Sequence, residues 1–406
     1  MKIIAADYTY IDGIFEKKYA VAFDQKIIAV GPYTELIMQY PEAELIAQKP
    51  YTVLYPGFIN THAHIEFSAN KTTLRYGSYI PWLYSVIDDR NHLVEKCTEG
   101  IMQRACEEML QSGVTSLGAV SSFGHDLETC ITTPQRVIYF NELIGHNPKT
   151  IDSLYNDFLQ RFEASSHYAD RNVVPAIAIH SPYSVHPIIL KKAVTLAKEK
   201  QVPISAHFLE SRAERTWLKE GDGEFRTFFK SFFDQDKPFT TIDEFLSHFD
   251  GYPTHFAHCV QAKEKELKKI AEEGHTVAHC PRSNRLLGCG RLQIERLEAL
   301  DIHFSVATDG LSSNYTLNIF DELRAALMMH HGLELQTLAK HLIQSITADA
   351  AKILKLDCGR IAEGYHADFA LIQLPEKPVL EEDIALWTIL YTQKVAQLYI
   401  EGEQHV

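Results

Sequence analysis

The sequence lacks a long hydrophobic run. No stretch of about 18 consecutive apolar residues occurs, so we expect no membrane-spanning helix. The N-terminus reaches Asp7 before the apolar core of a signal peptide could form. The seven cysteines are odd in number and none forms a C-x-x-C pair, which argues against a disulfide framework or a zinc knuckle. We therefore expect reduced thiols and a cytoplasmic location.

Positive charge is also in short supply. The chain has 39 Lys and Arg against 53 Asp and Glu, a formal net charge of -14, and nucleic-acid binders usually carry a basic face. We therefore expect no nucleic-acid partner and a small-molecule ligand instead. The 406 residues exceed the usual size of one hydrophobic core, which predicts a large domain with a smaller appendage.

Eight short apolar runs follow Pro56, and polar residues and segments of helical period separate them. They read GFINTHAH, GVTSLGAV, RVIYFNEL, VVPAIAIHS, VPISAHFLE, THFAHC, HTVAHC and IHFSVATDG. The clearest helical segment spans 263–273, and further helices are expected over 317–330 and 334–356. Eight strands alternating with helices predict a parallel (β/α)8 TIM barrel whose active site gathers at the carboxyl ends of the strands.

Both ends of the chain have a β-like pattern. YAVAFDQKIIAVG lies near the start, and GRIAEGYHADFALIQL and VAQLYIEGEQ lie near the end. We therefore predict an α/β protein in which residues 1–54 and 357–406 together form a small β-sandwich domain. Residues 55–356 then form the barrel.

Titratable side chains stand where the predicted strands end. His62 and His64 are two residues apart, so both side chains point to the same side of a strand. An H-x-H pair alone is often mere packing, but His207, His258 and Asp309 end three other strands. Histidines and a carboxylate delivered to one rim suit zinc or another divalent transition metal.

Six segments resemble the amidohydrolase superfamily, in the family's order and over nearly the whole chain. They are PGFINTHAH, AHFLES, AHCV, AHCPRSN, ATDGLSSN and GRIAEGYHADFALI. The most similar branch contains mononuclear-metal deaminases of cytosine, guanine, adenosine and S-adenosylhomocysteine. The resemblance implies that the metal ligands are His62, His64, His207 and Asp309. It also implies that His258 hydrogen-bonds the attacking water and that Glu210, three residues after the strand-five histidine, transfers a proton.

One departure from the superfamily bears on the number of metal ions. Binuclear members use a carbamylated lysine on strand four, but VVPAIAIHSPYSV contains no lysine and offers His180. We therefore expect one divalent ion per chain, with Zn²⁺ preferred and Fe²⁺ or Mn²⁺ as alternatives. His180 is expected to bind substrate, and the alternative is a histidine hydrogen-bonded to a backbone carbonyl.

These parts predict a hydrolytic deaminase, that is, an enzyme acting on a cyclic amidine C–N bond. Asp309 takes the proton of a water that the metal has acidified, Glu210 protonates the ring nitrogen, and His258 stabilises the developing oxygen. Collapse releases ammonia and leaves a carbonyl. The choice of deamination over amide hydrolysis depends on the resemblance, and the remote alternative is a non-catalytic scaffold with the same architecture.

The segments IPWLYSVI, HSPYSVHP, HFLESRAE and HCPRSNRLLG resemble those of the aminodeoxyfutalosine deaminases. The resemblance implies deamination of 6-amino-6-deoxyfutalosine to futalosine in menaquinone biosynthesis. That substrate is an adenine nucleoside bearing a benzoate at the far end of its sugar. The alternatives are S-adenosylhomocysteine, methylthioadenosine, adenosine and guanine.

Several further residues are candidates for substrate contacts. Asp88 or Asp89 could accept hydrogen bonds from sugar hydroxyls, although acidic residues at a helix end are more commonly solvated. Glu142 stands at the end of strand three, and Arg282 or Arg212 could meet an anionic substituent. The insertion at 211–245 is rich in aromatic residues and could form a lid or a subunit contact. The sequence is compatible with a homo-oligomer.

Overall fold

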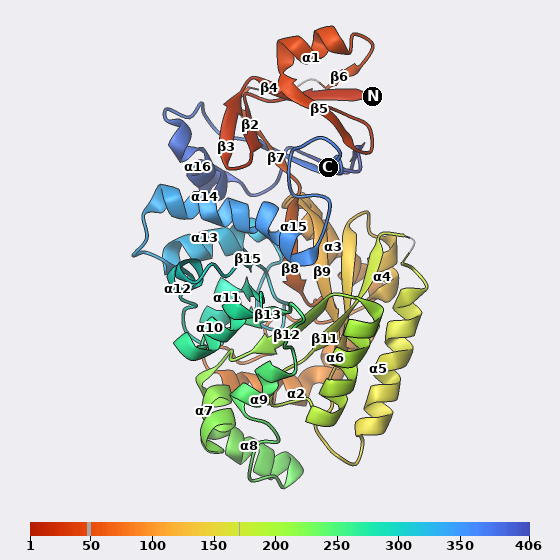
Figure 1. Ribbon diagram of the computed structural model, residues 1–406, viewed down its shortest axis with the longest axis vertical. Helices are drawn as coiled ribbons and strands as arrows, with labels where there is room; N and C mark the ends of the chain where they lie inside the picture. Colours follow the sequence, from red (N-terminus) through yellow and green to blue (C-terminus); the bar gives the residue numbers. More distant parts are fainter. Residues whose placement is uncertain (47–49, 170) are drawn as a thin grey trace.

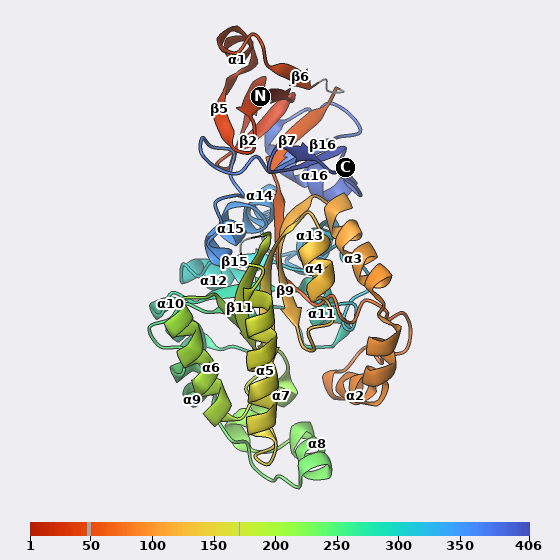
Figure 2. The same ribbon diagram turned by 90° about the vertical axis from the view of Figure 1, so that its right-hand side faces the viewer.

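The computed structural model describes residues 1–46, 50–169 and 171–406. It places a barrel beneath sheets built from both ends of the chain, and the two termini lie close together at the same end (Figure 1). Helices α2 (Tyr79–Lys96), α7 (Arg212–Glu220) and α8 (Glu224–Phe233) lie at the opposite end (Figure 2). The carboxyl ends of the barrel strands face these helices.

The barrel consists of eight strands in sequence order, each parallel to its neighbour. They are β8 (Phe58–Ala63), β9 (Val114–Ser121), β10 (Arg136–Leu143), β11 (Val173–Ile179), β12 (Ile204–Phe208), β13 (His255–His258), β14 (Thr276–His279) and β15 (Phe304–Val306). The first and last strands meet where the backbone N–H of Asp309 donates to the carbonyl of His62 at 3.0 Å. The eight predicted strands and the TIM-type barrel are confirmed.

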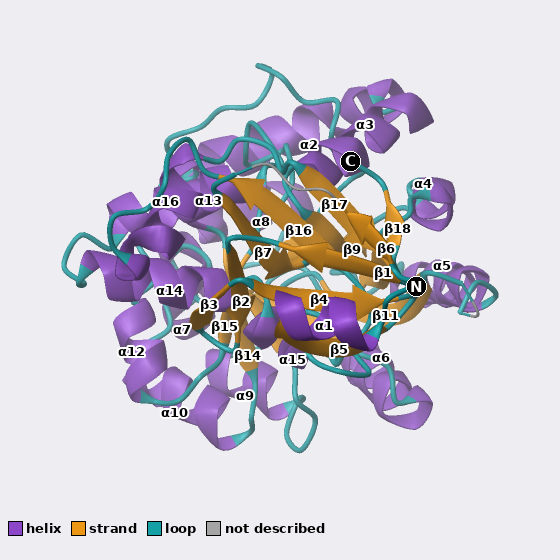
Figure 3. Cartoon of the chain, turned by 90° about the horizontal axis from the view of Figure 1, so that it is seen from above, coloured by secondary structure: helices purple, strands orange, loops and turns teal. Residues whose placement is uncertain are grey.

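Helices surround the strands on the outside of the barrel (Figure 3). Besides α2, α7 and α8 they are α3 (Glu99–Gln111), α4 (Leu127–Thr132), α5 (Ile151–Ser166), α6 (Pro187–Lys200), α9 (Ile242–Ser247), α10 (Glu264–Glu272), α11 (Pro281–Leu286), α12 (Ile294–Ala299), α13 (Ile319–Met329), α14 (Leu335–Ser345) and α15 (Ala348–Leu354). The helix predicted over 334–356 is two helices, because the chain turns at Thr347, whose hydroxyl bonds back to the carbonyl of Ile343 at 2.8 Å.

Two sheets cap the barrel: the first is built from N-terminal strands alone, and the second combines strands from both ends of the chain. The first has the order β5 (Ile27–Pro32), β4 (Tyr19–Phe23), β1 (Lys2–Ala5), β6 (Glu44–Ile46). The second has the order β18 (Glu403–Gln404), β17 (Gln397–Ile400), β16 (Phe369–Gln373), β7 (Thr52–Pro56), β2 (Tyr8–Ile11), β3 (Ile14–Lys17). Helix α1 (Tyr33–Gln39) packs on the first sheet, and α16 (Ile384–Tyr391), preceded by the 3-10 turn Glu381–Asp383, packs on α14.

The junction between these sheets and the barrel is short. Strand β7 pairs with β16 and is followed almost at once by β8, so the sheet leads directly into the strand that carries His62. The predicted domain division after residue 54 therefore falls inside β7. No helix in the described part of the chain is long and apolar enough to cross a membrane. All seven cysteines are free and buried.

Candidate active site

Four side chains that the sequence predicts as metal ligands converge at the carboxyl end of the barrel. The Nε2 atoms of His64 and His207 lie 3.4 Å apart. Oδ1 of Asp309 lies 3.8 Å from Nε2 of His62 and 3.6 Å from Nε2 of His64. This is the spacing of donor atoms around a common centre, and three imidazoles with one carboxylate are a donor set for a divalent transition metal.

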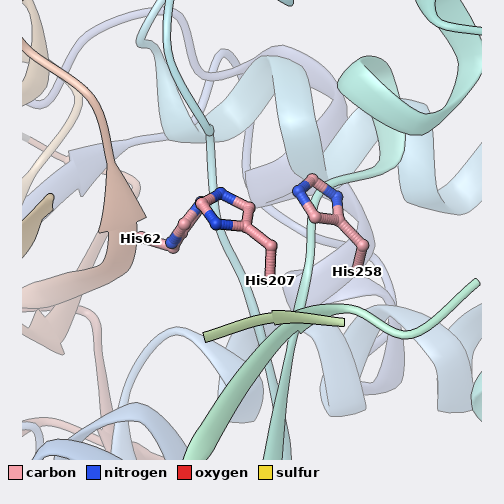
Figure 4. Close-up of side chains that lie close together, drawn as sticks. All are labelled: His62, His207 and His258. Atoms are coloured by element: carbon pink, nitrogen blue, oxygen red, sulfur yellow. The ribbon is translucent and has the colours of Figure 1, made fainter. Parts of the chain in front are cut away.

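The hydrogen bonding of the imidazoles fits a bound cation. Nδ1 of His207 donates to the carbonyl of His180 at 2.7 Å, which leaves Nε2 free as a ligand. His62 is 1% exposed, and neither of its ring nitrogens has a hydrogen-bond partner among the described residues. Burial lowers the pKa of both His62 and His207 well below the ordinary value, so both are in the neutral form that binds metal. Figure 4 shows these two rings beside that of His258.

Asp309 is held in place by its backbone and by hydroxyl groups. Its φ of 56° is in the left-handed region, which is costly for an aspartate and is typical of a functional site. Ser283 Oγ and Ser313 Oγ each donate to Oδ2 at 2.7 Å, and the N–H of Gly310 donates to Oδ1 at 2.8 Å. Burial alone raises the pKa of Asp309, but His258 and other nearby histidines lower it to about 2. Asp309 is therefore ionised near neutral pH.

Glu210 lies just beyond β12, beside this cluster. Its Oε1 is 3.8 Å from Nε2 of His258, and Tyr79 donates to its Oε2 at 3.0 Å. Burial raises the pKa of Glu210 while His258 opposes the rise, and a raised carboxyl pKa suits a group that donates a proton near pH 7. Glu214 fixes the turn, since it accepts from the N–H of Leu209 at 3.0 Å and from that of Glu210 at 2.7 Å.

His258 faces both carboxylates. Its Nδ1 donates to Oδ1 of Asn284 at 2.9 Å, and its Nε2 lies 3.9 Å from Oδ2 of Asp309. Burial lowers its pKa, but Glu210 and Asp309 outweigh burial and raise the pKa above the ordinary value. Nε2 is also near enough to join His62 and His207 around one ion. Its predicted role as a hydrogen-bond donor to water, and not as a ligand, stays a prediction.

The metal-ligand cluster together with Glu210 and His258 forms the floor of a cavity of about 580 Å³. Its lining includes His64, His207, Glu210, His258 and Asp309, together with apolar and aromatic side chains from α2, α8 and the loop after β9. The volume lies in the range of pockets that enclose ligands larger than a single ring. The floor is polar and the walls are mainly apolar.

A model of the amidohydrolase family matches residues 53–404. The chain belongs to the amidohydrolase family. An aminodeoxyfutalosine deaminase from a Nitratiruptor species is 46% identical over 387 residues, which cover 95% of each chain. An adenosine deaminase of Helicobacter pylori is 34% identical over 95% of this chain and 94% of its own.

A solved structure of Helicobacter pylori aminofutalosine deaminase in complex with methylthio-coformycin matches with a TM-score of 0.96. It is 32% identical and covers 100% of both chains. The predicted family, fold and deaminase class of this amidohydrolase are thereby confirmed. Deaminases of the family use a divalent metal ion, and the substrate is a small molecule.

Three of the predicted substrate-contacting residues, Glu210, His180 and Glu142, line the cavity of this amidohydrolase. Nδ1 of His180 lies 2.5 Å from Oγ of Ser184. Glu142 accepts from Ser122 Oγ at 2.5 Å through Oε2, and its buried Oε1 has no hydrogen-bond partner among the described residues. His180 and Glu142 therefore stay candidates for substrate contacts.

The other candidates lie outside the cavity lining. Helical spacing turns Trp82, Val86 and Arg90 of α2 toward the cavity, so Asp88 and Asp89 point elsewhere. Arg212 is exposed at the start of α7 and is not in the lining. The insertion at 211–245 contributes aromatic residues of α8 to the cavity wall.

Arg282 is 5% exposed and does not line the cavity either. Its Nε donates to Oε1 of Glu322 at 2.6 Å, and its guanidinium lies over the ring of Tyr315 at 4.6 Å. The two residues that follow it, Ser283 and Asn284, hold Asp309 and His258. Arg282 thus anchors a segment that supports the floor, and this structure gives no support to its predicted contact with an anionic substituent.

Sequence reasoning missed five residues that orient the floor: Tyr79, Glu214, Ser283, Asn284 and Ser313. Three of them lie in the quoted motifs AHCPRSN and ATDGLSSN. Their polar side chains directly after strand ends were the available signal. The hydrogen-bond partner of each residue is evident only in the folded structure, where the strand ends lie side by side.

Proposed function

We propose that this amidohydrolase is a metal-dependent deaminase that converts the 6-amino group of an adenine nucleoside to a carbonyl and releases ammonia. The preferred reaction is 6-amino-6-deoxyfutalosine to futalosine, a step of menaquinone biosynthesis. The observation that carries the proposal is the buried Glu210, which lies beside His258 at the edge of the metal-ligand cluster. The 46% identity to an aminodeoxyfutalosine deaminase over nearly the full length supports the choice of substrate.

The floor can assist each proton movement of this reaction. A divalent cation held by His62, His64, His207 and Asp309 would polarise a water molecule and lower its pKa. The ionised Asp309 accepts a proton from the attacking water. Glu210 donates a proton to the ring nitrogen next to C6, and His258 donates a hydrogen bond to the oxygen that adds there. The amino group takes up the proton held by Asp309 and leaves as ammonia, while the C6 hydroxyl returns a proton to Glu210 and becomes a carbonyl.

The wall above the floor can hold the nucleoside. Oε1 of Glu142 lies 3.8 Å from Nδ1 of His207 and has no hydrogen-bond partner among the described residues, so it can accept a hydrogen bond from a sugar hydroxyl. If Ser184 donates to Nδ1 of His180, the other ring nitrogen of His180 carries a proton that can be donated to the substrate. These two residues replace Asp88 and Asp89 as the proposed contacts.

Zinc is the proposed metal. Imidazole and carboxylate donors suit Zn²⁺, and Fe²⁺ and Mn²⁺ bind similar donor sets. One ion per chain is expected because β11, the fourth barrel strand, carries no lysine that could bridge a second ion. Metal analysis of the purified protein tests both points, and two tightly bound ions per chain would contradict the mononuclear site. A homo-oligomer stays a prediction.

The substrate test is ammonia release from a panel of amino compounds. We expect kcat/KM to be highest for aminodeoxyfutalosine, ahead of S-adenosylhomocysteine, methylthioadenosine, adenosine and guanine. Methylthioadenosine is the second candidate because a solved relative binds methylthio-coformycin. A lead of roughly tenfold or more for methylthioadenosine or guanine would overturn the preferred substrate and leave the deaminase proposal intact. No ammonia from any compound, together with no bound metal, would indicate a non-catalytic scaffold.

A further inference from the structure

Helix α2 forms one wall of the cavity along three of its turns. Its cavity-facing residues are Tyr79, Trp82, Leu83, Val86, Ile87 and Arg90. Tyr79 marks the inner end, because its hydroxyl donates to Glu210. Arg90 follows about three turns later, which is about 16 Å farther along the helix axis. The face of α2 between them is apolar, so Arg90 is, among the described residues, the one charged side chain that this helix presents to the cavity.

Arg90 lies beside a fixed aromatic surface. Its guanidinium carbon is 6.0 Å from the ring centroid of Phe123, whose ring in turn lies 6.2 Å from that of Phe67. Both rings line the cavity. The carboxylate of Glu66 accepts from the backbone N–H of Phe123 at 3.0 Å and from that of His125 at 2.8 Å. The loop that carries Phe123 is therefore held to the end of β8, and its ring is pre-positioned.

The charged groups that line the cavity leave Arg90 without an anion. The other arginine, Arg161, pairs with Asp157 at 3.0 Å and donates to the carbonyl of Glu142 at 2.9 Å. Glu210 and Asp309 face the histidines of the floor. Arg90 is exposed and has no ion pair or hydrogen bond within the described part of the chain. An arginine in this position can take an oxyanion in two parallel hydrogen bonds.

We propose that Arg90 and Phe123 form a subsite for an aromatic carboxylate carried at the far end of the substrate. The ring of that group stacks on Phe123 and its carboxylate pairs with Arg90. This inference rests on the proposed function, because it places the purine of the substrate at the metal-ligand cluster and the aromatic carboxylate of the same substrate at Arg90. It also transfers the role that the sequence suggested for Arg282 or Arg212 to a residue that lines the cavity.

The test compares two substrates, aminodeoxyfutalosine and its methyl ester, which lacks the negative charge and carries one additional methyl group. We expect wild type to prefer the acid in kcat/KM, and Arg90→Met to reduce the acid-to-ester ratio about fivefold or more. Arg90→Lys should retain part of the ratio. Lys96→Met is the matched control, because it removes an exposed charge from the same helix outside the cavity lining. A ratio that is the same in wild type and Arg90→Met would overturn the subsite.

A second readout separates this inference from the proposed function. The exposed ion pair is screened by salt, so the acid-to-ester ratio of wild type should fall with ionic strength, and that of Arg90→Met should not. If wild type released no ammonia from either compound, the preferred substrate of the proposed function would be wrong. Calorimetric binding of the acid and the ester to wild type and Arg90→Met would then test the subsite, and equal affinities would overturn it.

Discussion

The two ends of the cavity differ in how their side chains are held. At the inner end, His62 and Asp309 are 1% and 6% exposed, and the carboxylate of Asp309 accepts hydrogen bonds from two serines. At the outer end, Ile144 and Leu154 are 37% and 36% exposed, and Arg90 has no ion pair in the described part of the chain. The inner end is therefore organised before any ligand arrives, and the outer end leaves groups free for one.

The difference follows from the elements that build each end. The inner end is made by residues at or just beyond the carboxyl ends of β8, β12, β13 and β15, where the barrel fixes the position of each strand end. The outer end is made by α2, α5, α8 and the loops after β9 and β10, which pack on the barrel from outside its strands. We infer that the inner end determines the reaction and the outer end selects the substrate.

The largest loss is expected at the inner end, for Asp309→Asn. Asparagine keeps the shape but removes the charge that pairs with the metal and accepts the water proton, so we expect metal content to fall and kcat/KM to drop on the order of 10³ or more. Metal analysis and ammonia release measure both. The control is Asp301→Asn, since Asp301 has the same φ of 56° but is exposed. Activity near wild type with a full metal complement would remove Asp309 from the site.

Glu210→Gln should separate proton transfer from metal binding. Glutamine can still hydrogen-bond to Tyr79 but cannot donate a proton from a carboxyl group, so we expect near-normal metal content and a loss in kcat on the order of 10² or more. Glu220→Gln, at the exposed end of α7, is the control. If the Glu210 variant lost its metal, its role would be structural. If it kept its turnover, another residue would have to act as the acid.

The inner end could be predicted from the sequence because its signal is local. Each ligand or proton donor ends a strand or follows it within a few residues, and the two-residue spacing of His62 and His64 fixes their common direction. The family resemblance supplied the role of Glu210, three residues after His207. The alternating pattern at both ends of the chain also predicted the β-strands found there, while the division into domains stays a prediction.

The outer end could not be predicted because it depends on helix rotation and docking. Asp88 and Arg90 are two residues apart, yet only Arg90 lines the cavity, since α2 turns by about 100° per residue. Arg282 stands in a motif beside the active site, but its side chain turns away to the buried Glu322. The sequence predicts that these residues lie near the active site. It does not predict the direction in which their side chains point.

Arg282→Met sharpens the comparison, because it should reduce stability and not substrate selectivity. Methionine leaves Glu322, which is 0% exposed, without its ion-pair partner, so we expect the free energy of unfolding to fall by about 3 kcal/mol. Urea-induced unfolding of the metal-loaded protein measures this. Arg360→Met is the control, since Arg360 pairs with Asp12 at the surface and should cost less than about 1 kcal/mol. A stable Arg282 variant with a reduced acid-to-ester ratio would return the anion contact to Arg282.

Phe123→Leu should have the smallest effect, at the outer end. Leucine keeps an apolar surface but loses the aromatic face, a difference of about 1 kcal/mol, so we expect KM for aminodeoxyfutalosine to rise about two- to fivefold with a smaller change in kcat. The control is Phe232→Leu, because Phe232 on α8 is 46% exposed and does not line the cavity. Steady-state kinetics with both variants measure the changes in KM and kcat separately. A large fall in kcat at constant KM would mean that Phe123 acts on the reacting end of the substrate, and the division of the cavity into two ends with separate tasks would then be wrong.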